Sequence, residues 1–380
     1  MISLFTDMSS ELLYPVMPLY LNSIGFSIVL IGLLEGIAEA SSGLSKGYFG
    51  KWSDESGKRL PFVRLGYFLS AISKPLMVVF VFPFWVFGLR TMDRLGKGIR
   101  TGARDAILSH ESTKENKGKV FGFHRSMDTI GAVVGPSLGL LYLYFHPASY
   151  KTLFVFALIP GLLAVAISFL LKEKTFEKKR SKSISFFSFL KYWKTSTKSY
   201  RQLVKGLLLF TLINSSDVFL LMKAKSEGMD DTWVIGLYIF YNLIYALAAY
   251  PLGLLADKIG LKKMYLFGIC LFAMVYIGMG TFSHHFMIGG LFLIYGLFAA
   301  ATEGISKAWI SNNCRNEDTG TAIGTYAAFQ SIFSLFASVF AGIIWMQLGS
   351  NMLFLFSGIS SIVVAIYLFR CKFETEINAN

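Results

Sequence analysis

Long apolar runs recur along the whole chain and are separated by short polar stretches. A helix that crosses the hydrocarbon core of a bilayer needs about 20 mostly apolar residues. Helices are favoured because lipid offers exposed backbone groups no hydrogen-bond partners. The pattern therefore predicts an all-α membrane protein with twelve transmembrane helices. The predicted spans are residues 1–21, 28–50, 61–82, 84–109, 119–145, 151–171, 203–222, 232–255, 264–283, 287–311, 320–346 and 351–369.

The composition agrees with this pattern. Of the 380 residues, 54% are hydrophobic and only 16% are charged, and the mean hydropathy is +0.55. A soluble domain averages about a quarter charged residues, so an ordinary water-soluble enzyme is excluded, and so is a disordered chain. Cys270, Cys314 and Cys371 are far apart and match no metal-ligand spacing. We therefore expect no metal site and no cofactor.

Basic residues are distributed unevenly between the predicted loops. Of the 36 Lys and Arg residues, only Lys151, Lys223 and Lys225 fall in loops on the side opposite both termini. Lys and Arg concentrate in cytoplasmic loops, so we expect both termini in the cytoplasm and the chain in a plasma membrane, as in a bacterial inner membrane. The net charge of +13 is then mostly a topology signal. We expect the protein to lie in the lipid bilayer, and we do not expect it to bind nucleic acid.

The longest connection, residues 172–202, begins with a basic run that ends at Lys182 and continues as ISFFSFLKYW at 184–193. A basic run followed by an aromatic amphipathic stretch is typical of a segment that lies on the inner leaflet. The pattern predicts an N-terminal six-helix bundle at 1–171, a basic cytoplasmic linker at 172–202 and a C-terminal six-helix bundle at 203–380.

The two predicted bundles repeat short patterns in the same order. Gly50-x-x-x-Asp54-x-x-Gly57-Lys58-Arg59 follows the second span, and Gly253-x-x-x-Asp257-x-x-Gly260-x-Lys262-Lys263 follows the eighth. Ser9-Ser10-Glu11 returns as Ser215-Ser216-Asp217, and Gly118-x-x-x-Gly122 returns as Gly320-x-x-x-Gly324. Matches at a nearly constant offset are typical of transporters built from two homologous halves.

These paired loops resemble the signature of the major facilitator superfamily, and the resemblance covers essentially the whole chain. Arg90-x-x-Asp93-x-x-Gly96-x-Gly98 is similar to the family motif of the fourth span. Gly131-x-x-x-Gly135-Pro136-x-x-Gly139 resembles the fifth-span motif associated with drug/proton antiporters, in a bacterial branch of the superfamily. The resemblance implies secondary active transport by alternating access, with spans 1, 4, 7 and 10 lining a central cavity.

The fourth predicted span carries a stripe of charge. Arg90, Asp93, Arg94 and Lys97 fall on one helical face, which cannot face lipid. Asp7 and Glu11 share a face of the first span, and Glu35 and Glu39 share a face of the second. We predict Glu35, Glu39 and Asp93 as carriers of a coupling proton. The alternative for them is permanent pairing with basic residues of these spans, such as Lys46 and Arg94.

A second group of residues suggests a conformational role. Asp54 and Asp257 are expected to hold helix ends together with neighbouring bases, while Gly50 and Gly57 permit a tight turn. Arg104 is expected to join the network around Asp54. In the fifth span, the glycine motif predicts close packing of the two halves. The complete conformational set is Gly50, Asp54, Gly57, Lys58, Arg59, Arg104, Arg125, Asp128, Gly131, Gly135, Pro136, Gly139, Asp257 and Gly260.

The second half carries fewer intramembrane charges. They are Asp217, and Glu303 and Lys307 one helical turn apart, while Asn242 and Tyr245 add polar surface on one helix face. The ionic site is therefore expected in the first half, with an apolar and aromatic wall from the second. The complete pathway set is Asp7, Glu11, Glu35, Glu39, Arg90, Asp93, Arg94, Lys97, Asp217, Asn242, Tyr245, Glu303 and Lys307.

Together these patterns predict proton-coupled export of a small amphipathic organic compound by a monomer. The alternative is an importer or exchanger of an organic anion, a carboxylate or a phosphate ester, because clustered Arg and Lys suit such anions. A non-transporting membrane receptor is a minor alternative. An enzyme is not expected, and the sequence lacks the G-x-x-x-x-G-K-[ST] loop of ATP-driven systems.

Overall fold

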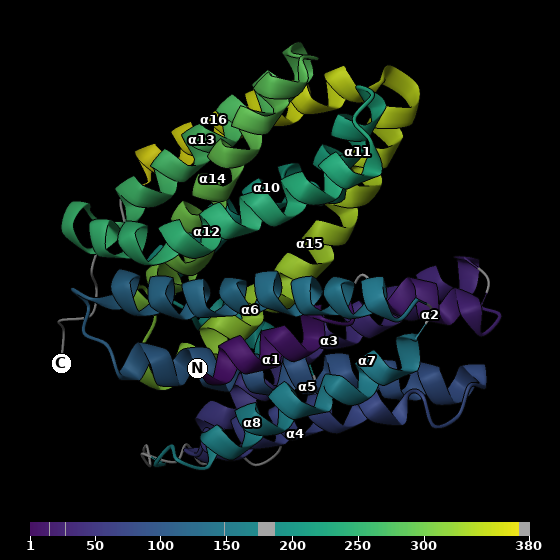
Figure 1. Ribbon diagram of the computed structural model, residues 1–380. Helices are drawn as coiled ribbons and strands as arrows, with labels where there is room; N and C mark the ends of the chain where they lie inside the picture. Colours follow the sequence, from purple (N-terminus) through teal and green to yellow (C-terminus); the bar gives the residue numbers. More distant parts are fainter. Residues whose placement is uncertain (15, 27, 148, 174–186, 372–380) are drawn as a thin grey trace. The chain divides into compact units, whose positions relative to one another are not determined.

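The structure is a computed structural model that describes residues 1–14, 16–26, 28–147, 149–173 and 187–371. Helices account for the regular structure, and the described residues contain no β-strand. The chain divides into two compact units (Figure 1). The first unit is Met1–His110, Met127–Thr195 and Asn316–Ala328, and the second is Glu111–Ser126, Ser196–Arg315 and Phe329–Asn380.

The first unit is built mainly from the N-terminal helices. Within it, α5 packs against both α3 and α4, and α8 packs against α1 and α4. Its elements are α1 (Ile2–Glu11), α2 (Met17–Ser23), α3 (Ile28–Ser56), α4 (Leu60–Leu76), α5 (Pro83–His110), most of α6 (Lys117–Phe145), α7 (Tyr150–Phe156), α8 (Leu158–Ser168), η1 (Ser188–Lys191), α9 (Tyr192–Thr195), η2 (Asn316–Asp318) and the start of α15 (Thr319–Leu348).

The second unit repeats this plan with the C-terminal helices. Here α14 packs against α12 and α13, and α13 also packs against α16. Its elements are the start of α6, then α10 (Lys198–Ile213), α11 (Val218–Ser226), α12 (Asp231–Ile259), α13 (Leu261–Thr281), α14 (His285–Asn312), the rest of α15 and α16 (Ser350–Arg370). Helices α6 and α15 therefore each begin in one unit and continue in the other.

Each predicted span corresponds to one helix or to a pair of consecutive helices, which confirms the predicted fold class. Eight helical segments of the described chain are long and apolar enough to cross a membrane, and each overlaps one of the last eight predicted spans. The four predicted spans from 1 to 109 are helical as well. They fall short of the length and composition expected of a membrane helix because α1 and α2 are separate short helices and because α3 and α5 carry many charged residues.

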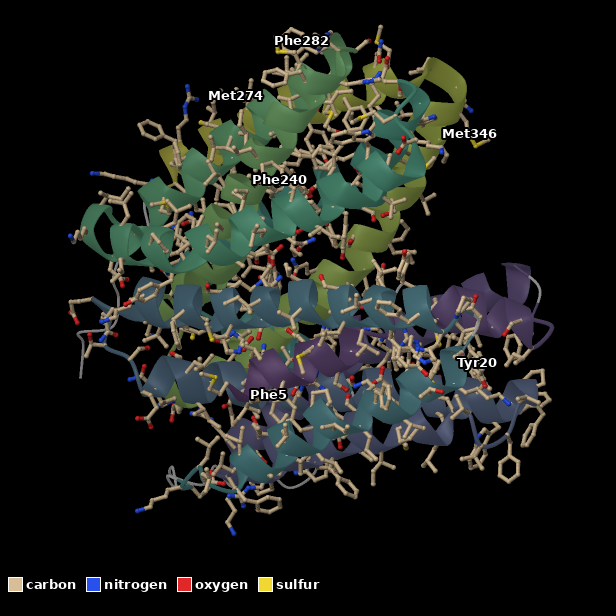
Figure 2. All side chains as sticks on the ribbon, in the orientation of Figure 1. Phe5, Tyr20, Phe240, Met274, Phe282 and Met346 are labelled. Carbon is tan, nitrogen blue, oxygen red and sulfur yellow. The ribbon has the colours of Figure 1, made fainter. Side chains whose placement is uncertain are left out.

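Large apolar side chains point outward from the helices (Figure 2). Met274, Phe282 and Met346 are examples, and their exposed fractions are 54%, 48% and 85%. An aqueous surface would disfavour so many exposed apolar groups. They are expected of helices that face lipid.

The linker places one of its aromatic residues in the protein core. Its basic run at 174–182 lies outside the described residues. The following Phe189, in η1, is only 1% exposed. A Cβ atom on Gly47 of α3 would lie 2.7 Å from its ring, and the hydroxyl of Thr325 donates a 3.5 Å hydrogen bond to its carbonyl oxygen. Phe189 is therefore part of the core of the first unit, because burying an aromatic ring is more favourable than leaving it at an interface.

The glycine motif of α6 also differs from its predicted role. A Cβ atom on Gly131 would lie 2.4 Å from the carbonyl oxygen of Leu4, and one on Gly135 would lie 2.6 Å from that of Met8. Gly139 likewise approaches α1. These glycines therefore pack α6 against α1 within the first unit, and the prediction that they join the two halves is wrong. Pro136 lies inside α6, which remains helical to Phe145.

Candidate functional site

A chain of four alternating charges crosses the first unit. The guanidinium of Arg90 donates two hydrogen bonds of 2.8 Å to the Glu35 carboxylate and one of 3.2 Å to Asp93. The other Asp93 oxygen lies 3.8 Å from the Lys74 ammonium. The exposed fraction of the side chain rises along this row of charges, from 3% for Lys74 and 5% for Asp93 to 34% for Glu35. The helices α3, α4 and α5 are thereby joined by ion pairs away from water.

Lys74 is the residue of this network that the sequence analysis missed. Its ammonium also donates a 3.1 Å hydrogen bond to the Ser9 hydroxyl of α1, and Ser9 in turn donates to the carbonyl oxygen of Ala157, between α7 and α8. Lys74 of α4 thus contacts α5 and α1 directly, and through Ser9 it is linked to the junction of α7 and α8. The signal was available, because a lone lysine inside an apolar span is costly unless it has a partner.

The remaining charges of the stripe are less tightly paired. Arg94 lies 3.9 Å from Glu39, whose side chain is 54% exposed. Lys97, Asp7 and Glu11 make no ion pair within 4.0 Å with any residue that the structure describes. Asp7 nevertheless interacts electrostatically with Lys97, Arg100 and Asp128.

The predicted proton carriers differ from the carboxylates of α1 in being paired with bases. Glu35, Glu39 and Asp93 all have basic partners, as in the alternative interpretation of permanent pairing. Asp7 and Glu11 lie on one face of α1 without such a partner. A carboxylate that has no paired base in a low-dielectric interior is the better candidate for binding and releasing a proton.

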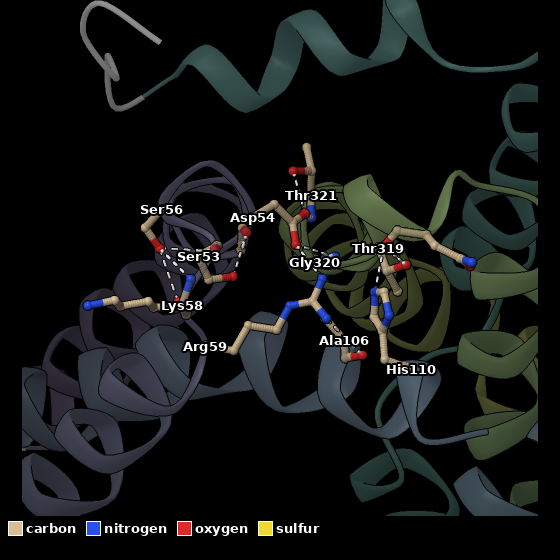
Figure 3. Close-up of polar contacts among 12 residues, drawn as sticks. Ser53, Asp54, Ser56, Lys58, Arg59, Ala106, His110, Thr319, Gly320 and Thr321 are labelled. Carbon is tan, nitrogen blue, oxygen red and sulfur yellow. Dashed lines mark hydrogen bonds and ion pairs between the residues drawn. The ribbon is translucent and has the colours of Figure 1, made fainter. Parts of the chain in front are cut away.

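The loop between α3 and α4 contacts the start of α15 (Figure 3). Asp54 accepts hydrogen bonds from the backbone N–H groups of Gly320 (3.3 Å) and Thr321 (2.6 Å) and from the Thr321 hydroxyl (2.8 Å). Arg59, itself 2% exposed, donates to the same carboxylate at 3.1 Å. A carboxylate at a helix N-terminus interacts favourably with the helix dipole. Asp54 thus joins three elements of the first unit.

Asp54 follows the predicted span 28–50. Burial raises the pKa of its carboxyl group to about 6, although the charge of Arg59 and the hydrogen bonds from Thr321 act to lower that pKa. At neutral pH this carboxyl group is therefore mostly ionised and can hold Arg59. Arg104 does not take part, contrary to expectation, because its guanidinium pairs with Asp105 at 2.9 Å.

The glycines of this loop have different functions. Gly57 has a φ of 67°, which favours glycine at the turn. Gly50 lies inside α3, where a Cβ atom would lie 2.4 Å from the carbonyl oxygen of Gly320. Gly50 therefore permits a close helix crossing instead of the predicted turn. Lys58 is exposed.

The second unit contains the related contact. Asp257 accepts hydrogen bonds of 2.7 Å from the backbone N–H groups of Gly118 and Lys119 at the start of α6. Gly260 has a φ of 100°, as the turn requires. No basic side chain of the described residues forms an ion pair with Asp257. Asp257 therefore differs from Asp54, which pairs with the buried Arg59.

Asp217 lies where α10 ends and α11 begins. One of its carboxylate oxygens accepts a 2.7 Å hydrogen bond from the Tyr241 hydroxyl, and the other accepts one from the Tyr295 hydroxyl. Tyr241 and Tyr295 are 5% and 3% exposed. Asp217 forms no ion pair with the described residues.

The other predicted residues of the second half form a neighbouring polar group. Arg125, at the start of α6, donates hydrogen bonds to the Tyr245 hydroxyl and, at 3.3 Å, to Glu303. Asn242 donates to the backbone of its own helix. Lys307 is partly buried one turn beyond Glu303 on α14.

The chain resembles known proteins over nearly its whole length. The model of the Major Facilitator Superfamily matches residues 1–242 and 228–378. An uncharacterised MFS-type transporter of Methanocaldococcus jannaschii is 32% identical over 372 residues, which cover 96% of this chain and 92% of that protein. A homologue of the multi-drug resistance efflux pump PmrA from Lactococcus lactis is 26% identical over 385 residues, covering 90% of this chain and 91% of the homologue.

Solved structures share the fold. The crystal structure of the human organic anion transporter MFSD10 aligns with a TM-score of 0.81 over 97% of both chains, at 17% sequence identity. At that identity the likeness shows the fold alone. The family match and the sequence relatives show more: the chain belongs to the major facilitator superfamily of multi-pass membrane transporters, whose members are transporters rather than enzymes.

Proposed function

We propose that this chain is a proton-coupled exporter of a small amphipathic organic compound. The observation that carries the proposal is the pairing of bases in the first unit. Lys74, Arg90 and Arg94 each lie within 4.0 Å of a carboxylate, namely that of Asp93, Glu35 or Glu39. These bases are already neutralised by their own chain, so their charge is not free for an anionic cargo.

The coupling proton is assigned to Asp7 and Glu11. Both lie on α1 without an ion-pair partner among the described residues. The charged groups nearest Asp7 are Lys97 and Arg100 on α5 and Asp128 on α6. A movement that changes the distance to those bases would change the proton affinity of the carboxylate, and this is what coupling to alternating access requires.

Two further observations support export and the orientation of the chain in the membrane. The similarity to a multi-drug efflux pump homologue favours export of an organic compound. The distribution of basic residues favours both termini in the cytoplasm of a plasma membrane, such as the inner membrane of a bacterium. Because one such chain contains both six-helix halves, we expect it to act as a monomer.

Transport by purified protein in liposomes with an imposed pH gradient tests the proposal. A fluorescent pH probe inside the vesicles reports proton movement as organic cations and then organic anions are added. We expect a cation to drive proton movement that is lost in Asp7→Asn and Glu11→Gln. The control is Glu115→Gln, an exposed carboxylate in the loop before α6, which should leave the signal unchanged. Absence of proton movement with either group of compounds would contradict proton coupling.

An organic anion exchanger is the second candidate. It is favoured by one observation: the Lys97 ammonium lies within the predicted span 84–109 without an ion pair among the described residues. The same assay separates the two candidates. A response to carboxylates or phosphate esters alone, lost in Lys97→Ala and Arg94→Ala, would replace the exporter proposal with the anion proposal.

A further inference from the structure

The first predicted span of each half is interrupted at an equivalent position. In the first unit α1 ends at Glu11 and α2 begins at Met17, and in the second unit α10 ends at Ile213 and α11 begins at Val218. Interrupted helices at corresponding positions of two repeats mark binding sites in transporters, because the break frees backbone and side-chain polar groups. Each interruption carries a carboxylate, Glu11 in one case and Asp217 in the other.

The polar groups around the second interruption are incompletely satisfied. The Asn214 side-chain oxygen is buried and has no hydrogen-bond partner among the described residues. The Ser215 hydroxyl lies 3.4 Å from the Tyr276 hydroxyl. The side chains of the described residues that bind the Asp217 carboxylate are those of Tyr241 and Tyr295, through their hydroxyl groups. A carboxylate at membrane depth without a basic partner is costly, so this position favours a positively charged ligand.

Aromatic rings cover the site on several sides. The Tyr241 ring lies 5.3 Å from the Tyr295 ring at 70° and 5.5 Å from the Tyr238 ring at 89°. Phe298 lies 5.4 Å from Tyr295. These rings come from α12 and α14, and Tyr276 adds a ring from α13. Ring faces attract organic cations, and cages of aromatic residues recognise quaternary ammonium groups.

We propose that Asp217, with the rings of Tyr241 and Tyr295, binds the cationic group of an organic ammonium or similarly charged substrate. The carboxylate supplies the opposite charge, and the rings supply faces that a hydrated inorganic ion does not use. Asp217 is only partly buried, so a ligand can reach it. This assignment rests on the proposed export function and names its substrate class.

The rest of the second unit supports a cationic ligand. Among the charged groups of the described residues, Glu303 of α14 acts electrostatically on Asp217. The titratable groups packed around it are the hydroxyls of Tyr241 on α12, Tyr276 on α13 and Tyr295 on α14. Arg125, a base of the neighbouring polar group, is bound to Glu303 and Tyr245.

Two probes of the same shape and opposite charge test the inference. Tetraphenylphosphonium is a cation and tetraphenylborate is an anion, and binding of each to the purified full chain in nanodiscs is measured by equilibrium dialysis. We expect the wild-type protein to bind the cation and to discriminate against the anion. Asp217→Asn keeps the size and the acceptor oxygen but removes the charge, and should weaken cation binding about 10- to 100-fold.

Two substitutions of Tyr295 test the contribution of the aromatic ring. Tyr295→Phe keeps the ring face, whereas Tyr295→Leu removes it, so only the leucine variant should lose the roughly 2- to 30-fold contribution of a ring–cation contact. Asp230→Asn is the matched control. Asp230 is exposed and caps α12 by accepting from the Trp233 N–H, and asparagine caps equally well.

The outcomes separate this inference from the proposed function. Equal binding of the cation by wild type and Asp217→Asn, or preference of the wild type for tetraphenylborate, overturns the site, even if liposomes show proton-coupled transport. Selective cation binding that depends on Asp217 supports the site. If proton movement is nevertheless absent in liposomes, only the coupling part of the proposed function fails. The probe comparison on wild-type protein decides the charge preference even if a variant does not fold.

Discussion

In the first unit the Asp93 carboxylate lies between the Arg90 guanidinium and the Lys74 ammonium, whereas in the second unit the Asp217 carboxylate is held by two tyrosine hydroxyl groups. Both carboxylates lie in spans that the sequence predicts to cross a membrane. Asp93 is neutralised by its own chain, and Asp217 is not. A charge that is already neutralised connects helices, while a charge that is not can receive a ligand.

Under the proposed function, this difference assigns the two units different roles in transport. Ion pairs join α3, α4 and α5 of the first unit, while Asp7 and Glu11 on α1 form no ion pair with the described residues and are proposed to carry the proton. The predicted spans of the second unit carry few charges, and its aromatic surface suits an amphipathic compound. Proton and cargo would then bind to different helices, and their coupling would depend on the motion of the helices instead of competition for one group.

The largest effect is expected from removing the central charge of the paired network. Asp93→Asn removes the counter-charge of Lys74 and of one of the three hydrogen bonds that Arg90 donates to carboxylates. Breaking a buried ion pair by removing one partner destabilises a protein by about 3–5 kcal/mol. Unfolding of the purified protein in mixed micelles, followed by circular dichroism, measures this loss.

Glu35→Gln is the control for that measurement, because Glu35 is 34% exposed and its loss leaves Arg90 paired with Asp93. We expect a clearly smaller loss for Glu35→Gln than for Asp93→Asn. Equal losses would show that the network does not depend on its buried centre.

A smaller effect is expected where Asp54 and Asp257 hold the ends of helices. Asp54→Asn removes the carboxylate that pairs with the buried Arg59 at 3.1 Å, and should cost about 3 kcal/mol. Asp257→Asn loses only charge-assisted contacts to two backbone N–H groups and should cost about 1 kcal/mol. The same unfolding measurement compares the two variants.

Asp54→Asn combined with Arg59→Met provides the control. An apolar residue in place of Arg59 removes the buried charge that has lost its Asp54 partner, so the double variant should be more stable than Asp54→Asn alone. A double variant that is less stable than the single one would show that Arg59 contributes mainly through contacts other than Asp54.

Close packing of α1 on α6 should be sensitive to a single methyl group. In Gly135→Ala the new Cβ would lie 2.6 Å from the Met8 carbonyl oxygen, a backbone atom that cannot move aside alone. We expect a loss of about 1–3 kcal/mol. The matched control is Gly342→Ala in α15, where nothing lies within 4 Å of the added Cβ. That variant should be neutral or slightly stabilised, because alanine favours a helix more than glycine does. An equal loss in both variants would show that the loss at Gly135 does not come from its packing against α1.

The sequence predicted the fold because membrane thickness fixes the length of each apolar run. It also predicted most of the charged residues that meet in the first unit, since a charge inside a span is visible without a structure. It did not show which carboxylate pairs with which base, because those pairs depend on how α3, α4 and α5 are rotated against one another. Lys74 was visible as a charge inside the predicted span 61–82, but its partners Asp93 and Ser9 were not.

Other features depend on contacts between segments far apart in the chain. Phe189 looks like a membrane anchor in the sequence because its neighbours are aromatic and basic, but Gly47 leaves space for its ring. The hydroxyl groups that hold Asp217 come from residues 24 and 78 positions away. Their aromatic character was visible, but the direction in which each hydroxyl donates was not.

The smallest stability effect is expected at Asp217, although its loss should have the largest effect on binding. Asp217→Asn leaves no base unpaired, and the Tyr241 and Tyr295 hydroxyls can still donate to the amide oxygen. We therefore expect a change in unfolding free energy of no more than about 1 kcal/mol, together with the loss of tetraphenylphosphonium binding. A residue that mainly stabilises the fold would behave in the opposite way, as Asp93 should. If Asp217→Asn unfolds as easily as Asp93→Asn, then Asp217 is part of the structural framework, and the contrast between the two units is not a division between framework and site.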